Sequence, residues 1–486
     1  MIKDLEYTNR QILPRWVPFS QINVLNPVKT IAEDNSPLEK NNYKKLENTW
    51  NTIKTVPLAI EIITTSHTLD IADTIIYKEA IDYLIENHCD VINDNNYLSS
   101  LLGKSKNIQK TARENIHLLR NMSFINPSDD ILWVDLAYFY AIQGQKEKAQ
   151  KCIDTSLYLK PTNVFSIKSI IKYLLLTDNV EEALWLINSN DDLKNNPQLI
   201  STEISICESY GLKSKLLRKG YNITRDLQLR QSIENELFAT IATMEFNSGN
   251  SKKGQKLFFQ SLLYPNENIV AQSRYISMKF NKNIDNASQI VPCSYERDAW
   301  VSYNDGDFEK AIDNSKNWFY FQPFSITPAM MNSYINSLIY NREDEAIRIV
   351  DKALKISPKN FDLLNNKIVS LFRSNNICEA NAKLNELKKI DLLSEDDATV
   401  LLATQGLAAF RNNQLEEGIN KYKQAIELFK KRNCFEQYCR ALYYFAYELK
   451  NSNQSIYLDI IMESKKLADK FSYKDIQQAI KNSFQL

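Results

Sequence analysis

Residues that could support catalysis or hold a metal are few in this chain of 486 residues. Its three histidines, His67, His88 and His117, all precede residue 120, and none has the spacing of a metal-binding motif such as H-E-x-x-H. Nucleophilic catalysis needs a base beside the nucleophile, and the sequence offers no Ser/His or Cys/His arrangement of that kind. We therefore predict that the protein is not an enzyme and has no catalytic residues, metal site or cofactor.

Two further local patterns fail on their spacing. Residues 103–105, Gly-Lys-Ser, match the end of a P-loop, but Leu98 stands where the first glycine of that motif is required. Cys434 and Cys439 lie five positions apart, which does not fit the usual spacing of a zinc site. Neither pattern predicts a bound nucleotide or metal.

Cysteine usage and hydropathy indicate the compartment. The seven cysteines are odd in number and scattered, which suits reduced thiols of an intracellular protein better than a disulfide framework. The first residues do not combine a basic stretch with an apolar core, as a signal peptide would. No apolar run approaches the roughly 18 residues that span a bilayer. We expect a cytoplasmic protein without a membrane segment.

One basic segment could contact nucleic acid. Several cations lie close in sequence to Tyr221. The cations could contact phosphates, and the ring of Tyr221 could stack on a base. The cations are Lys213, Lys215, Arg218 and Lys219. The alternative is a solvated helix surface. Because Lys+Arg and Asp+Glu both number 59, the chain lacks the overall basic excess of most nucleic-acid binders. Nucleic-acid binding through residues 213–230 therefore stands as an alternative function.

The composition predicts helices joined by short turns. Hydrophobic residues make up 44% of the chain, whereas glycine (9) and proline (13) are scarce. The stretch from Trp133 to Pro161 is typical of two short helices with a turn at Gly144. It resembles a tetratricopeptide repeat, a helix–turn–helix unit of 34 residues, at these positions: Trp133, Leu136, Ala137, Tyr140, Gly144, Ala149, Ser156 and Pro161.

A single unit of this kind cannot bury its own apolar face, so its neighbours must be similar. The resemblance implies an all-α fold, a right-handed α-solenoid of about eight to nine helical hairpins with an irregular helical N-terminal cap. We divide the chain into an extended N-terminal arm (1–38), an irregular helical region (39–122), a first array (123–266), a single helix and hinge loop (267–292), a second array (293–470) and a C-terminal capping helix (471–486). The arm is rich in apolar residues, and we expect it to pack on its own solenoid or on a partner subunit.

The C-terminal half resembles a narrower group. The strings W-F-Y-F-Q-P-F-S-I-T-P and L-L-A-T-Q-G-L-A-A-F-R are similar to bacterial tetratricopeptide proteins that accompany nucleases or toxin-like effectors. This resemblance covers residues 290–430. It implies a sensor or regulatory subunit that works with such an effector in anti-phage defence.

The leading hypothesis is a non-enzymatic scaffold that binds a protein or peptide in its concave groove. Family positions that face the groove carry aromatic and amide side chains, which suit an extended peptide or a helix. In the first unit of the second array, these positions begin with Glu296. The partner-binding residues that we predict are Tyr138, Phe246, Asn247, Trp300, Tyr303, Asn304, Phe410 and Arg411. We expect about half of the rings to pack between helices instead.

Overall fold

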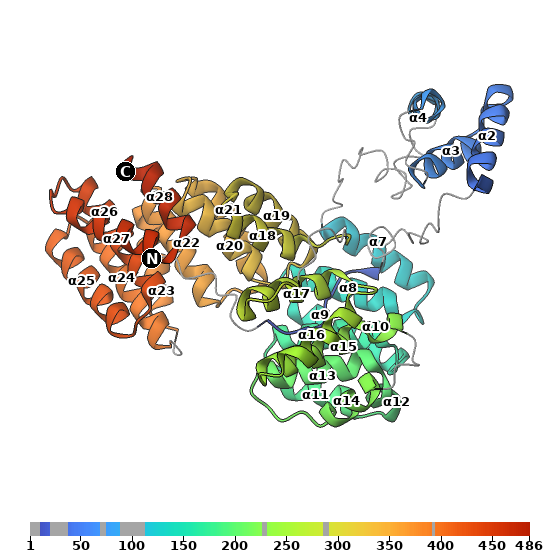
Figure 1. The fold of residues 1–486 in the computed structure, drawn as a ribbon, viewed down its shortest axis with the longest axis horizontal. Coiled ribbons are helices and arrows are strands. Elements are labelled where there is room, and N and C mark those ends of the chain that lie inside the picture. The colour runs from blue at the N-terminus through green and yellow to red at the C-terminus, as the bar shows by residue number, and fades with distance from the viewer. Residues whose placement is uncertain are drawn as a thin grey trace. The chain divides into compact units, whose positions relative to one another are not determined.

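The computed structural model describes residues 10–19, 37–68, 74–87, 112–225, 231–284, 291–390 and 394–486 (Figure 1). Within these ranges the regular secondary structure is entirely helical, and helices follow one another in pairs along most of the chain. The prediction of an all-α solenoid is confirmed. The described residues form two compact units, one of residues 17–139 and one of residues 10–16 together with 140–486. The two units are described separately.

The N-terminal unit packs three helices around a small core. Its helices are α2 (Pro37–Thr52), α3 (Val56–Thr68), α4 (Ile75–Asn87), α7 (Ala112–Ile125) and most of α8 (Asp130–Ile142). Trp50 of α2 is fully buried, lies edge-on to Tyr83 of α4 and donates a hydrogen bond to Glu79 (3.2 Å). Ala80 and Leu84 of α4 lie in the same core.

The second unit contains the repeat array. After the end of α8 its helices are α9 (Lys146–Leu159), α10 (Val164–Leu176), α11 (Val180–Asn188), α12 (Asp191–Asn195), α13 (Pro197–Ser209), α14 (Leu217–Arg225), α15 (Gln231–Asn247) and α16 (Ser251–Ser261). The pairing is interrupted by α17 (Glu267–Phe280). It resumes with α18 (Tyr295–Asp305), α19 (Phe308–Phe321), α20 (Thr327–Leu338), α21 (Glu343–Ile356), α22 (Phe361–Arg373), α23 (Ile377–Leu387), α24 (Glu395–Arg411), α25 (Leu415–Lys431), α26 (Phe435–Asn451) and α27 (Tyr457–Phe471), and the chain ends with α28 (Lys474–Phe484).

Short turns with one left-handed residue join the two helices of a pair. Glycine fills that position at Gly249 and Gly306, which have φ values of 83° and 85°. Asparagine fills it at Asn341, Asn375 and Asn413, with φ between 54° and 64°. Asparagine is, after glycine, among the residues that most readily adopt this conformation. The turn geometry is therefore kept although the glycine of the repeat signature is replaced.

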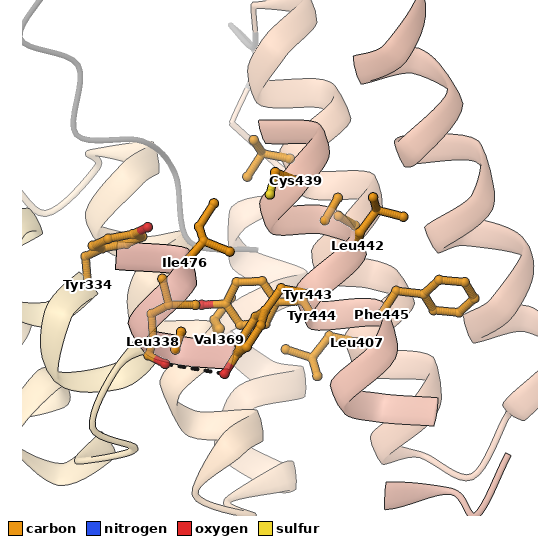
Figure 2. Packing of buried hydrophobic residues seen from close by; sticks show 14 of the residues in the cluster. Tyr334, Leu338, Val369, Leu407, Cys439, Leu442, Tyr443, Tyr444, Phe445 and Ile476 are labelled. Carbon is orange, nitrogen blue, oxygen red and sulfur yellow. Dashed lines mark hydrogen bonds between the residues drawn. The ribbon is translucent and has the colours of Figure 1, made fainter. Parts of the chain in front are cut away.

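Among the described residues, a large hydrophobic core lies in the C-terminal half of the array and is centred on α26. Nine consecutive residues of this helix, 438–446, are buried, so no side of it faces solvent over that stretch. Figure 2 shows the rings of Tyr443 and Tyr444 in this core with Ile476 of α28. The Tyr443 hydroxyl donates to the carbonyl of Leu338, at the end of α20 (3.4 Å). A helix of a hairpin normally exposes one face, and here α28 covers the remaining face of α26.

Candidate protein-binding surface

The first helices of successive pairs, with α17 among them, contact one another along much of the array, and we call the face that they line the inner face. A non-helical segment of the chain lies on it. Residues 10–16, which we call the arm segment, run beside α17 (Figure 1). The amide of Asn268 donates to the Leu13 carbonyl (3.0 Å), and the amide of Gln272 donates to the Arg10 carbonyl (3.0 Å). Asn268 and Gln272 are four residues apart and so lie on one side of α17. Two amide side chains therefore hold the backbone of the arm segment.

The two arginines of the arm segment converge on one carboxylate. Arg10 donates to both oxygens of Glu296 on α18 (2.7 and 3.1 Å) and also to the side-chain oxygens of Gln272 (2.5 Å) and Asn268 (2.8 Å). Arg15 donates to Glu296 (2.5 Å) and to the side-chain oxygen of Gln322. The planar guanidinium of Arg10 thus reaches four acceptors, a pattern that a lysine ammonium with three donors on a single nitrogen cannot reproduce.

The ion cluster is buried, and burial strengthens the interactions between its charges. Only 8% of the Glu296 side chain is exposed. Burial opposes the ionised form of Glu296, but the two guanidiniums outweigh it and lower its pKa to about 2. Burial, together with the charge of Arg15, lowers the pKa of Lys172 on α10 to about 8, although Glu296 acts in the opposite direction. The carboxylate of Glu267 lies 3.9 Å from the Arg15 guanidinium. Glu296 is therefore ionised across the whole physiological pH range.

Two apolar side chains anchor the arm segment on either side of Pro14. Leu13 N–H donates to the Gln11 carbonyl (2.9 Å), which closes a three-residue turn with Ile12 at its tip. Ile12 is buried in the core that α15, α16 and α17 share. Trp16 is 2% exposed, stacks on Phe324 (4.9 Å between ring centroids) and lies edge-on to Tyr173 of α10 (6.0 Å).

The C-terminal helix occupies a second part of the inner face. Asp475 of α28 accepts hydrogen bonds from Tyr303 of α18 (3.0 Å) and from Tyr334 of α20. The guanidinium of Arg440, which is fully buried on α26, donates to Tyr334 (2.5 Å) and to Asp475 (3.5 Å). Asn482 donates to the carbonyl of Ile339 (2.9 Å). The helix therefore contacts the first helices of three pairs.

One segment of the chain matches a known sequence family. Residues 132–163 match the tetratricopeptide repeat. The match covers one unit, formed by α8, α9 and the turns beside them. No curated protein sequence matches the chain.

Several solved structures are similar to the chain over most of its length. One is a human IFIT1 dimer with PPP-AAAA, which is 14% identical over 92% of this chain and 99% of that chain, with a TM-score of 0.32. Another is the APC/C hetero-tetramer Cut9-Hcn1, 12% identical over 94% of this chain and 96% of that chain, with a TM-score of 0.38. Likeness at this level says nothing about what the chain binds.

Most of the predicted partner-binding rings have neighbours inside the chain. Phe246 is buried and stacks on Phe280 of α17 (5.3 Å). Trp300 is 2% exposed and lies edge-on to Tyr303, whose hydroxyl is held by Asp475. Phe410 is buried beside Tyr422 and Phe445, and Tyr138, in the N-terminal unit, is buried beside Phe139.

The predicted polar residues of the inner face are also engaged within the chain. Asn247 donates to Glu208 (3.2 Å) and accepts from Lys279 (3.4 Å). Asn304 donates to the Trp300 carbonyl (2.7 Å), and Arg411 forms an ion pair with Glu448 (2.7 Å). A partner-binding role for these residues and for the buried rings stays a prediction.

The basic segment lies on and before α14. Lys213, Lys215 and Arg218 are exposed, and the Lys219 ammonium donates to the side chain of Asn195. The backbone N–H of Lys215 donates to Glu203, a buried carboxylate of α13 (2.8 Å). Three of the four cations are therefore open to solvent, and nucleic-acid contact through them stays a prediction.

The described ranges offer no candidate for a metal site. Within them no group of His, Cys, Asp or Glu side chains could hold a metal ion, and no helix is long and apolar enough to cross a membrane. Cys152 and Cys207 are buried thiols, and burial raises their pKa to about 11 and about 12. Residues 103–105, His88 and Cys89 lie outside the described residues.

Sequence reasoning missed most of the residues that hold the arm segment. Glu296 stands at a family position that faces the groove, so that position was foreseeable. Asn268 and Gln272 lie on α17, the helix outside the regular pairing, and the repeat pattern assigns no role to them. Their spacing of four on one helix was the available signal, because it places two amides on one face.

Proposed function

We propose that this chain is a non-enzymatic protein-interaction scaffold whose inner face binds a non-helical segment of a protein partner. The tetratricopeptide repeat at residues 132–163 and the helical array support a scaffold in general. The finer proposal, a peptide-binding inner face, is supported by one observation. Asn268 and Gln272 hold the backbone carbonyls of a non-helical segment, and such bonds bind a peptide without requiring a particular sequence.

A co-purification experiment tests the proposed function. The full chain, isolated under native conditions from its own cells, should retain a protein partner that mass spectrometry identifies. A variant with Asn268→Ala and Gln272→Ala should lose that partner. Asn381→Ala should keep it, because the amide of Asn381, which is partly buried, bonds to Asn412 and not to the arm segment. Recovery of the same partner by the double variant would refute binding at this surface.

A role beside a nuclease or toxin-like effector is a narrower proposal. It is supported by the resemblance of residues 290–430 to bacterial tetratricopeptide proteins that accompany such effectors. An effector gene next to the gene for this chain, with its product among the co-purified proteins, is the expected finding. A partner unrelated to nucleases or toxins would reject the narrower proposal and leave the scaffold function standing.

A further inference from the structure

The arm segment is held as a bound peptide would be held. Its backbone is fixed by amides, its two arginines reach one buried carboxylate, and Ile12 and Trp16 fill apolar sites. Every one of these contacts joins residues at least 150 positions apart in the sequence. None depends on the arm belonging to the same chain. The surface that holds it is therefore a receptor surface, and the arm segment shows which side chains that surface accepts.

The charge of the receptor surface restricts what can replace the arm. Without the two arginines, the buried carboxylate of Glu296 loses both guanidiniums that form ion pairs with it, and Glu267 loses the nearby charge of Arg15. A buried carboxylate that loses its partner is strongly destabilising. A replacing segment must therefore bring its own cations to Glu296.

The geometry further selects arginine. Arg10 engages both Glu296 oxygens and two amide oxygens together, which needs a planar fork of donors. Arg15 follows five positions later, and Trp16 directly after it enters the site between Phe324 and Tyr173. Arginine pairs and a following aromatic ring are thus the recognisable features of an occupant.

We propose that the partner of this surface is a non-helical protein segment with two arginines five residues apart and an aromatic residue directly after the second, and that the arm segment occupies the same place until that partner displaces it. This inference rests on the proposed function and names its partner class. A tethered competitor lowers the apparent affinity of a partner by the fraction of open receptor. The arm segment therefore admits only partners that match its own pattern.

A peptide-binding experiment with the full chain tests this proposal. The probe is a fluorescent synthetic peptide of residues 8–19, T-N-R-Q-I-L-P-R-W-V-P-F. The receptor is the full chain with Arg10→Ala and Trp16→Ala, which weaken its own arm. We expect this receptor to bind the probe at least about tenfold more tightly than the unaltered chain does. A tenfold change requires that the arm segment lose only about 1.4 kcal/mol of its own binding free energy. Far-UV circular dichroism verifies that the receptor keeps its helical content.

Specificity variants complete the experiment. A probe with lysine at both arginine positions should bind about tenfold or more weakly, and Glu296→Gln in the receptor should weaken the original probe similarly. Glu309→Gln is the matched control, because Glu309 also pairs with both donor nitrogens of an arginine, Arg342, but is exposed. Equal binding of the arginine and lysine probes by a folded receptor would overturn the proposed specificity.

Competition separates this inference from the proposed function. The unlabelled peptide should displace the co-purified partner from the full chain. A partner that depends on Asn268 and Gln272 but is not displaced would overturn the inference and leave the scaffold function intact. Absence of any partner that depends on these amides would count against both. Dimers that form through exchange of the arm between two copies, and dissociate on addition of the peptide, would instead identify a second copy as the occupant and overturn the proposal of a separate partner.

Discussion

Replacing Glu296 with glutamine should release the arm segment. The substitution keeps the size of the side chain but removes the charge that both guanidiniums share. The pKa of Glu296 falls from the ordinary 4.5 to about 2, and at about 1.4 kcal/mol per pKa unit this difference corresponds to about 3 kcal/mol of interaction with the folded chain. The typical cost of removing one partner from a buried ion pair, about 3–5 kcal/mol, is of the same size.

Native-state proteolysis measures this effect at the arm itself. Trypsin cleaves after arginine, and cleavage between Arg15 and Trp16 requires the arm to leave the surface that buries it. When opening and closing are faster than cleavage, the rate follows the fraction of open molecules. A loss of about 3 kcal/mol should therefore raise the rate of this cleavage about hundredfold. Mass spectrometry follows the product that begins at Trp16.

A matched control fixes the interpretation. Glu309→Gln removes an exposed partner of Arg342, which should cost about 0.2–1 kcal/mol and leave cleavage at Arg15 unchanged. The reasoning fails if Glu296→Gln leaves the rate at Arg15 unchanged while the variant remains helical. It also fails if both variants accelerate this cleavage equally, because the effect would then not arise from the buried cluster.

Three further predictions concern acidity, the C-terminal helix and close packing. Because the pKa of Glu296 is lower in the folded chain than in the unfolded one, the stabilisation by Glu296 is present above pH 4.5 and is lost as the pH falls toward about 2. The difference in unfolding free energy between the wild type and Glu296→Gln, measured in urea, should therefore shrink over that range. A constant difference would contradict the pKa assignment. Asp475→Ala leaves the buried Arg440 with one carboxylate fewer. If α28 loses about 3 kcal/mol of stabilisation, its amide hydrogen exchange should accelerate by about two orders of magnitude. Unchanged exchange would show that the pair does not hold the helix. Gly418→Ala would place its Cβ 2.6 Å from a ring carbon of Phe410, so we expect a net destabilisation of about 1–3 kcal/mol despite the better helix propensity of alanine, and a raised thermal midpoint would contradict it.

The hairpins could be predicted because their signals are local. A helix pair needs small residues where its helices touch and a turn of fixed geometry, and both requirements recur at a fixed spacing. At Asn341 and Asn375, asparagine stands at the glycine position of the repeat signature, and the turn keeps its left-handed residue. The third pair carries few family landmarks, yet a Cβ at Gly220 of α14 would lie 3.0 Å from Ile204 and 3.3 Å from Ile241, so a small residue is needed there for close approach.

The contacts of the two chain ends could not be predicted in the same way. Arg10 is separated from Glu296 by 286 positions and from Gln272 by 262, and no periodic pattern links such residues. The apolar composition of the arm indicated that it packs, but its binding surface depends on which helices the solenoid brings together. Similarly, Asp475 on a short polar helix gave no sign that it would meet Tyr303 and Tyr334. Local sequence therefore specifies the units, whereas the occupancy of the inner face is a tertiary property.

The interruption of the repeat at α17 has a physical consequence for binding. A helix within a regular pair buries one face against its partner and one against each neighbouring unit, so few side chains remain for a ligand. The described residues after α17 supply no paired second helix before α18 begins at Tyr295. Asn268 and Gln272 of α17 and Glu296 of α18 instead meet on one surface, with the backbone of the arm segment between them. The departure from the repeat is thus the place where the array gains polar groups that can hold a peptide.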